Sequence, residues 1–262
     1  GNAGNSFDGT TANRNTLIGY DAGTSITGAD DNTFVGTNAG DAVTTGQENT
    51  FVGRHAGGGT NTGRSNVAMG YETFVTNTTG NYNTALGYEA LRANTTASNN
   101  TAVGQGALRN NTTGSPNTAV GYRALYTNTT GQQNVALGYQ SMRLNETGSY
   151  NCAVGYDSLE ANTTGAQNTA TGNHSLTANT TGSLNSAFGN TALDANTTGS
   201  HNSAFGHNAL GANTTGDQNT ALGYAALDAL VNNSANVAIG CSSLSSLSNG
   251  TGNTGVGYHS LR

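Results

Sequence analysis

The chain is built almost wholly from one 17-residue unit that recurs without insertion or deletion. The copy at 117–133 reads Asn-Thr-Ala-Val-Gly-Tyr-Arg-Ala-Leu-Tyr-Thr-Asn-Thr-Thr-Gly-Gln-Gln, and the positions of the repeat are numbered 1 to 17 from its Asn. Fourteen complete copies and a truncated fifteenth begin at Asn15, Asn32, Asn49, Asn66, Asn83, Asn100, Asn117, Asn134, Asn151, Asn168, Asn185, Asn202, Asn219, Asn236 and Asn253. A period this regular predicts a solenoid, in which each unit is too small to bury its own apolar face and stacks on its neighbours.

Composition favours regular backbone pairing over a conventional core. Only 34% of the residues are hydrophobic, 39 are Gly, and there is no Trp and a single Pro. We therefore predict an all-β, parallel β-solenoid of about fifteen coils over residues 15–262, one elongated domain with negligible helix and a rise of about 4.8 Å per coil. Residues 1–14 are expected to form a partial, irregular N-terminal coil, in which 1–4 are an imperfect copy of a solenoid that continues upstream.

Charge argues against a nucleic-acid partner, and hydropathy argues against membrane insertion. The net charge is −6, and the eight basic residues are all Arg and are scattered singly, so there is no basic stripe for nucleic acid. No apolar run approaches the roughly 20 residues of a membrane-spanning helix, so no membrane insertion is expected in this segment. Cys152 and Cys241 lie five copies apart, or about 24 Å at the expected rise, too far for a disulfide.

Positions 3 and 9 vary together between copies. The first three copies pair a large residue at position 3 with Gly at position 9: Leu17 with Gly23, Phe34 with Gly40, Phe51 with Gly57. Copies four to fourteen reverse the sizes, with Ala at position 3 and Leu, Phe or Met at position 9. When two facing positions fill one interior volume of fixed size, a large side chain at one position requires a small side chain at the other. We therefore expect positions 3 and 9 to share one cavity.

Position 4 predicts self-association. If position 3 points into the coil, its strand neighbours at positions 2 and 4 point outward. Position 4 is nevertheless apolar in fourteen of fifteen copies, and a single solenoid would expose these side chains as one stripe larger than soluble monomers tolerate. The central part of this stripe, the predicted oligomer axis, consists of Val103, Val120, Leu137, Val154, Thr171, Phe188, Phe205 and Leu222.

Three further positions indicate how the coils hold together. Gly at position 5 is present in every copy and predicts a bend that needs positive φ or close backbone approach. The invariant Asn at position 1 is expected to form a hydrogen-bonded ladder from coil to coil. Tyr at position 6 would stack as a partly exposed aromatic row, either as packing or as a platform for sugars.

The run Asn-Thr-Ala-Val-Gly-Tyr followed by Ala-Leu resembles the Asn-Ser-Val-Ala-Ile-Gly repeat of YadA-like head domains in trimeric autotransporter adhesins. It is still more similar to the longer-period repeats of phage tail-fibre and bacterial surface-fibre proteins. The resemblance covers residues 15–262 and implies a left-handed β-roll, three chains around one axis, and a role in attachment. It departs from the adhesin pattern in its 17-residue period and in having no coiled-coil stalk, membrane anchor or intramolecular chaperone domain in this stretch.

Position 12 opens an Asn-X-Thr pattern in nine successive copies, which either accepts N-linked glycans or forms a turn. These asparagines are Asn77, Asn94, Asn111, Asn128, Asn145, Asn162, Asn179, Asn196 and Asn213. The adjacent Thr pairs also suggest an ice-binding solenoid, although neighbouring residues of a strand point opposite ways.

No catalytic or metal-ligating pattern recurs. The five His are scattered, no Asp or Glu row repeats, and no nucleophile stands beside a base, so we predict no enzyme, no metal and no cofactor. The expected function is a non-catalytic fibre or head segment of an extracellular attachment protein, on a cell surface or a virion. Its partners would be further copies of itself, most simply as a trimer, and a cell-surface glycan or extracellular matrix. The alternatives are the ice-binding solenoid and a polysaccharide-binding or polysaccharide-cleaving fibre with sites between chains.

Overall fold

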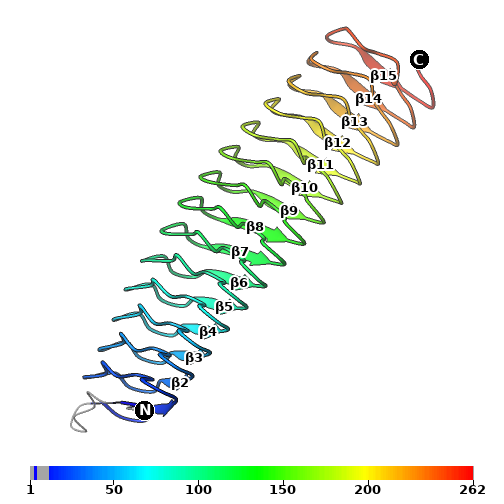
Figure 1. The fold of residues 1–262 in the computed structure, drawn as a ribbon. Coiled ribbons are helices and arrows are strands. Elements are labelled where there is room, and N and C mark those ends of the chain that lie inside the picture. The colour runs from blue at the N-terminus through cyan, green and yellow to red at the C-terminus, as the bar shows by residue number, and fades with distance from the viewer. Residues whose placement is uncertain (1–2, 5–11, 262) are drawn as a thin grey trace. The chain divides into compact units, whose positions relative to one another are not determined.

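The computed structural model describes residues 3–4 and 12–261, which divide into two units, 1–133 and 134–262. The first unit contains β1 (Thr16–Ile18), β2 (Thr33–Val35), β3 (Thr50–Val52), β4 (Val67–Met69), β5 (Thr84–Leu86), β6 (Thr101–Val103) and β7 (Asn117–Val120). The second contains β8 (Asn134–Leu137), β9 (Cys152–Val154), β10 (Thr169–Thr171), β11 (Ser186–Phe188), β12 (Ser203–Phe205), β13 (Thr220–Leu222), β14 (Val237–Ile239) and β15 (Thr254–Val256). Each coil contributes one short strand and returns through turns (Figure 1).

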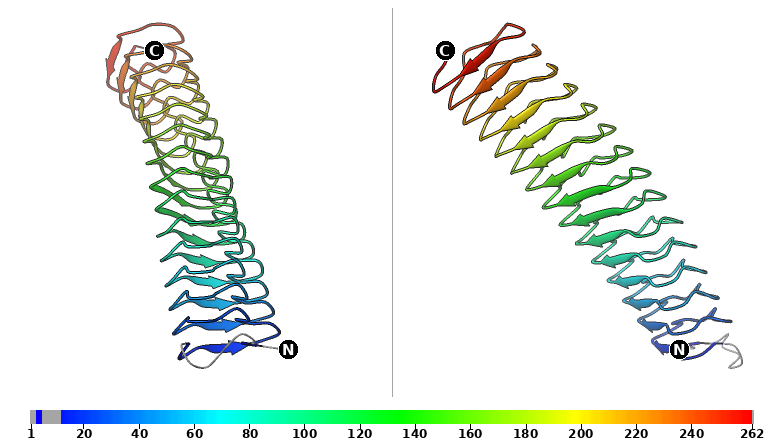
Figure 2. Two further views of the ribbon diagram at one scale, coloured as in Figure 1. Left: turned by 90° about the vertical axis from the view of Figure 1, so that its left-hand side faces the viewer. Right: turned by 180° about the vertical axis from the view of Figure 1, so that it is seen from behind.

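Within each unit, consecutive strands pair in parallel with a register shift of one repeat (Figure 2). Thr16 pairs with Thr33 in the first unit, and Thr169 pairs with Ser186 in the second. The predicted all-β parallel β-solenoid with 17 residues per turn is confirmed. The part of the chain that the structure describes contains no helix, and hence none long and apolar enough to cross a membrane.

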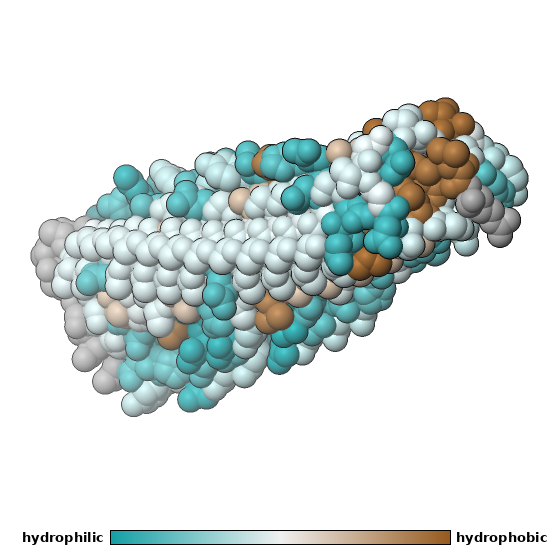
Figure 3. Space-filling model, turned by 90° about the horizontal axis from the view of Figure 1, so that it is seen from above, coloured by the Kyte–Doolittle hydropathy of each residue, from teal (hydrophilic) through white to brown (hydrophobic). Residues whose placement is uncertain are grey.

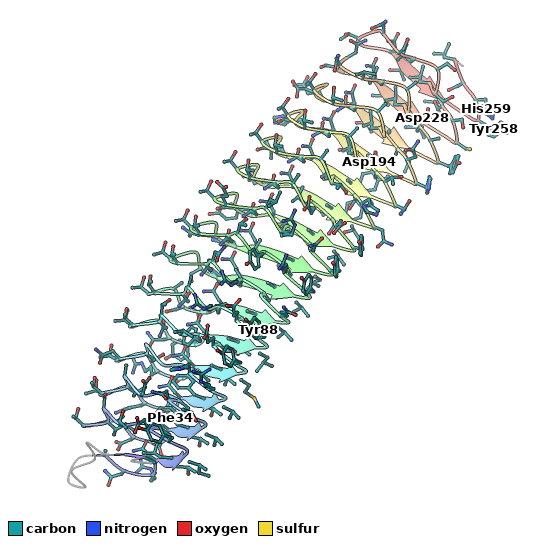
Figure 4. The ribbon with its side chains drawn as sticks, in the orientation of Figure 1. Phe34, Tyr88, Asp194, Asp228, Tyr258 and His259 are labelled. Atoms are coloured by element: carbon teal, nitrogen blue, oxygen red, sulfur yellow. The ribbon has the colours of Figure 1, made fainter. Side chains whose placement is uncertain are left out.

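The interior is filled by positions 3, 8, 9 and 12, which are buried in nearly all described coils. In the first coils Phe34 (Figure 4) occupies the volume beside Gly40, where an added Cβ would meet the ring. In later coils the small Ala119 and the large Leu125 are both fully buried. Positions 3 and 9 therefore share one cavity, as their exchange of sizes predicted.

Position 9 has a left-handed backbone in every complete copy, with Leu as well as with Gly. Gly40 has φ +58°, and Leu91, Leu125 and Leu159 have φ of +50°, +53° and +53°. This region costs a non-Gly residue roughly 1–3 kcal/mol, which the burial of a large side chain in the shared cavity offsets. The copies with Gly avoid the strain and fill the cavity from position 3 instead.

The asparagines at position 1 form the predicted ladder. In the first unit the backbone N–H and the Nδ2 of Asn49 both donate to Oδ1 of Asn32, at 2.9 and 3.1 Å, and Nδ2 also donates to the Gly63 carbonyl at 2.9 Å. In the second unit Asn202 donates its backbone N–H to Oδ1 of Asn185 at 3.0 Å. These side chains are buried, and each ties its own coil to the preceding one.

Gly at position 5 permits close approach between coils. Gly87 has φ +131°, and a Cβ on it would lie 2.7 Å from the Gly104 carbonyl oxygen. The predicted bend is confirmed. In the N-terminal region, Gly4 donates its N–H to the Ala22 carbonyl at 2.9 Å, as Gly23 does to Ala39 at 3.0 Å, so Ala3 and Gly4 belong to a partial coil. The rest of the predicted irregular coil, residues 1–2 and 5–11, lies outside the described residues.

Candidate functional site

The position-4 side chains stand on the outer face of the strands and form what we call the position-4 row. They alternate with buried position-3 residues, and none of them is buried. Phe188 and Leu222 expose 38% and 49% of their surface, and the rings of Phe188 and Phe205 stack with centroids 4.9 Å apart. All eight residues of the predicted axis lie on this face: Val103 and Val120 in the first unit, and Leu137, Val154, Thr171, Phe188, Phe205 and Leu222 in the second.

The position-6 tyrosines pack on one another. The rings of Tyr71 and Tyr88 (Figure 4) are parallel within 6° at 5.6 Å, and those of Tyr139 and Tyr156 are parallel within 4° at 5.0 Å. The Arg54 guanidinium lies 5.4 Å from the centroid of Tyr71. In each of these two pairs, one ring covers a face of the other. This geometry favours packing over a platform for sugar rings, which stack on open aromatic faces.

The position-12 asparagines form a second buried ladder. In the second unit Nδ2 of Asn179 donates to Oδ1 of Asn162 at 2.9 Å and to the Gly182 carbonyl at 3.0 Å. All nine candidate glycosylation sites (Asn77, Asn94, Asn111, Asn128, Asn145, Asn162, Asn179, Asn196 and Asn213) are fully buried. A glycan on Nδ2 would have to displace these bonds and leave the interior, so the folded coil favours the turn interpretation.

The two Thr positions of the turn differ in what their hydroxyls do. At position 13, Thr95 donates its hydroxyl to the Thr112 carbonyl of the next coil at 3.1 Å, and Thr163 does the same to Thr180 at 3.1 Å. At position 14 the Thr side chains are exposed from Thr45 to Thr130 in the first unit and from Thr147 to Thr215 in the second. The Thr pair thus supplies one outward row and not two.

A polar trough, with a volume of about 330 Å³, lies between positions 14 and 16 of the first unit. It is lined by Thr45, Gln47, Thr62, Arg64, Thr79 and Asn81. Its floor is the position-15 glycine, because Gly46 and Gly63 are buried and a Cβ on Gly63 would lie 2.5 Å from the Gly80 carbonyl oxygen. Figure 3 shows regular rows of residues of intermediate hydropathy along one face, with strongly hydrophilic side chains beside them.

Several charged groups lie at positions 7 and 10. In the first unit Arg109 Nε lies 2.7 Å from Glu89 Oε2, and this hydrogen bond lowers the pKa of the Glu89 carboxyl. In the second unit burial raises the pKa of the Asp157, Asp194 and Asp228 carboxyls, the last two labelled in Figure 4. These three belong to different coils, and within the described residues no group of three or more His, Cys, Asp or Glu is arranged to hold a metal ion.

Both cysteines are free thiols, and burial raises the pKa of Cys152.

Two features of the structure were not predicted from the sequence, the trough and the second Asn ladder. One signal for the ladder was present, because position 12 is apolar in four other copies, at Ile26, Val43, Leu230 and Leu247. Comparison with protein-family models, with curated proteins and with solved structures finds no match to this chain.

Proposed function

We propose that the chain is a non-catalytic structural segment of an extracellular attachment protein, a cell-surface adhesin or a virion fibre, whose copies associate through the position-4 row. The observation that carries the proposal is the outward, apolar character of this row on the strand face of both units. The repeat's resemblance to YadA-like heads and fibre repeats supports three chains per assembly, a left-handed coil, and attachment as the role.

The energy of association is adequate for this arrangement. Full burial of a Val, Leu, Ile, Phe or Met side chain gains about 1.5–3 kcal/mol, and the row residues are already about half covered, which leaves roughly 1 kcal/mol each. The fourteen apolar members of the row then supply on the order of 10–20 kcal/mol per chain, against about 4–15 kcal/mol of association cost. Contact along both units is therefore needed for a stable assembly.

The arrangement of charged groups supports a role without catalysis. General acid–base or nucleophilic chemistry needs two or more groups that converge on one reacting atom. The carboxyls whose pKa is raised, Asp157, Asp194 and Asp228, lie on separate coils. Asp157 and Asp194 interact electrostatically with His174, but in the part of the chain that the structure describes no side-chain hydrogen bond joins any of the three to another side chain. A coiled scaffold of this kind presents the same surface at every turn, which suits repeated weak contacts with a host surface or matrix.

The ice-binding solenoid is the second candidate, and the exposed Thr row at position 14 is the observation that favours it. The position-13 hydroxyls are used between coils, and position 16 varies from Ser to Arg and Asp, so the second row of a regular lattice is lacking. Thermal hysteresis of the chain would establish this candidate in place of attachment.

Sedimentation equilibrium of the intact chain at micromolar concentration tests the leading proposal. The expected result is a single species of three times the chain mass. A monomer at this concentration would overturn the association and, with it, the fibre role that depends on it.

A further inference from the structure

The polar trough of the first unit contains the one arginine of the described residues whose guanidinium has no partner. Arg64 lines the trough and donates only its backbone N–H, to Oδ1 of Asn81 at 2.9 Å. The other described arginines form ion pairs, hydrogen bonds or contacts with tyrosine rings; these are Arg14, Arg54, Arg92, Arg109, Arg123 and Arg143. A planar guanidinium with five unused donors is suited to a carboxylate or a sulfate.

The groups around Arg64 are hydroxyls and amides. The Thr45, Thr62 and Thr79 hydroxyls have no partner in the described part of the chain, and neither do the Gln47 side-chain amide and Nδ2 of Asn81. Successive coils repeat this lining at about 4.8 Å, which is close to the length of one sugar residue in an extended chain. The acidic residues of the neighbouring positions have partners. Asp30, at position 16 of the first coil, accepts the Asn13 backbone N–H, Asp31 pairs with Arg14, and Glu48 accepts a hydrogen bond from Ser65.

We propose that the trough between positions 14 and 16 of the first unit binds an acidic linear polysaccharide, with Arg64 holding a carboxylate or sulfate group and the Thr, Gln47 and Asn81 side chains bonding sugar hydroxyls. The proposal rests on the attachment role proposed above and specifies the chemical class of the ligand that is bound. An acidic peptide fits the trough less well, because the backbone N–H groups of Gly46 and Thr62 are donated to the next coil, to Asn61 and Thr78, and so cannot bond a peptide backbone.

The second unit supplies an internal comparison. Its position 14 is Thr in the first five coils, from Thr147 to Thr215, but position 16 of these coils holds short or acidic residues: Ser149, Ala166, Ser183, Ser200 and Asp217. The backbone N–H of Ala166 donates to Oγ of Ser183 at 3.0 Å, as that of Arg64 donates to Asn81. The same backbone without the cation is therefore expected to bind poorly, and Ala166 is the matched place to add one.

Isothermal titration calorimetry of the intact chain with a polygalacturonate octasaccharide, and with a sulfated galactan of equal length, tests this site. We expect one site per chain for at least one of the two, weakened about tenfold or more in Arg64→Gln and less in Arg64→Lys, because charge-assisted and bidentate bonds are lost. Arg54→Gln, which removes an exposed arginine of the position-6 row in the same unit, should change nothing. Adding an arginine by Ala166→Arg should raise the stoichiometry toward two.

Four outcomes would overturn the site: no binding of either acidic chain, equal binding by Arg64→Gln, equal binding of a neutral octasaccharide, or equal binding of inorganic sulfate alone. Equal or tighter binding of a polyglutamate peptide would assign the trough to an acidic protein instead. Circular dichroism of each variant shows whether the coil is kept. If the chain binds no acidic saccharide but sediments as a trimer, the polysaccharide site is wrong and the proposed fibre role is unaffected. If the chain binds the saccharide but sediments as a monomer, the fibre role is wrong and the polysaccharide site is unaffected.

Discussion

A Cβ atom on Gly40 would lie 2.6 Å from Cε2 of Phe34, so the ring at position 3 occupies the space that a side chain at position 9 would need. Later coils fill the same volume from the other position, with a small residue at position 3 and Leu at position 9, where the backbone is left-handed. Two ways of filling the same cavity therefore exist within a single chain, and we expect that mutation can convert one into the other.

Ala119→Leu alone should destabilise the first unit by about 1–3 kcal/mol through overpacking. Leu125→Gly alone should cost about 2–5 kcal/mol through the cavity, reduced by the relief of left-handed strain at φ +53°. The double variant should cost less than the sum by about 1–3 kcal/mol, since it recreates the pairing of the first copies. Urea denaturation of the four proteins measures this coupling, and additive free energies would show that the positions do not share a cavity.

The period and the inside-to-outside pattern could be predicted because strand residues alternate and the copies provide their own comparison. Position 3 inside and position 4 outside follow from the alternation of side chains along the short strand of each coil, as in β6. The remaining positions lie in turns, where side-chain direction is set by left-handed residues such as Leu91 and not by alternation. For this reason the buried Asn row at position 12 looked, in sequence, like an exposed turn.

The trough also escaped prediction, for a different reason. Arg64 is one of several scattered arginines in the sequence, and what distinguishes it is the lack of a partner, which depends on the neighbouring coils. Repetition predicts the scaffold well, but a candidate site arises where one copy departs from the repeat. Such departures need the three-dimensional neighbours to be interpreted.

Asn179→Leu should destabilise the second unit by about 2–4 kcal/mol, although Leu is tolerated at position 12 at Leu230. The substitution removes both the Nδ2 donor to Oδ1 of Asn162, at 2.9 Å, and the Oδ1 acceptor of the Asn196 Nδ2 group, at 2.8 Å. Oδ1 of the buried Asn162 then loses this donor, and Nδ2 of the buried Asn196 retains only its bond to the Gly199 carbonyl, at 3.0 Å. The change in urea midpoint measures the effect.

Asn213→Leu is the matched control, because Asn213 ends the ladder and its Oδ1 already has no partner among the described residues. It removes a bond to Asn196 on one side only, at 2.9 Å, and also removes the unpaired oxygen. The cost should be clearly smaller than that of Asn179→Leu. Equal costs would mean that coil-to-coil bonding in the ladder does not determine stability.

Asp228→Asn should stabilise the second unit at neutral pH and not at acidic pH. Burial raises the pKa of the Asp228 carboxyl, and its Oδ1 has no partner in the described part of the chain. A carboxyl whose pKa is raised on folding holds its proton more tightly in the folded state, so stability falls as pH rises from the unfolded value of about 4 through the folded pKa. Asn does not ionise, so the variant does not lose stability in this way. The urea midpoint of the variant minus that of the parent should therefore increase between about pH 3 and pH 7.

Asp31→Asn provides a control of opposite sign. The hydrogen bond from Arg14 lowers the pKa of the Asp31 carboxyl, so the stability it contributes is present above the unfolded pKa and lost as pH falls. This variant should lose a little stability at neutral pH and none at about pH 2. If Asp228→Asn showed the same difference from the parent at every pH, desolvation of the carboxylate would not be the cause.

The charge variant Val120→Asp with Val154→Asp tests the position-4 row in both units. In an assembly around this row, each substitution brings like charges together in a site shielded from water, where an unpaired carboxylate costs several kcal/mol or is forced to protonate. The double variant should lose assembly at neutral pH and partly regain it near about pH 4, as the carboxyls accept protons. Gln132→Asp, which places a charge at a turn position, should leave assembly unchanged. Analytical ultracentrifugation reports each state, and a double variant that stays fully assembled at neutral pH would place the interface on another face of the coil.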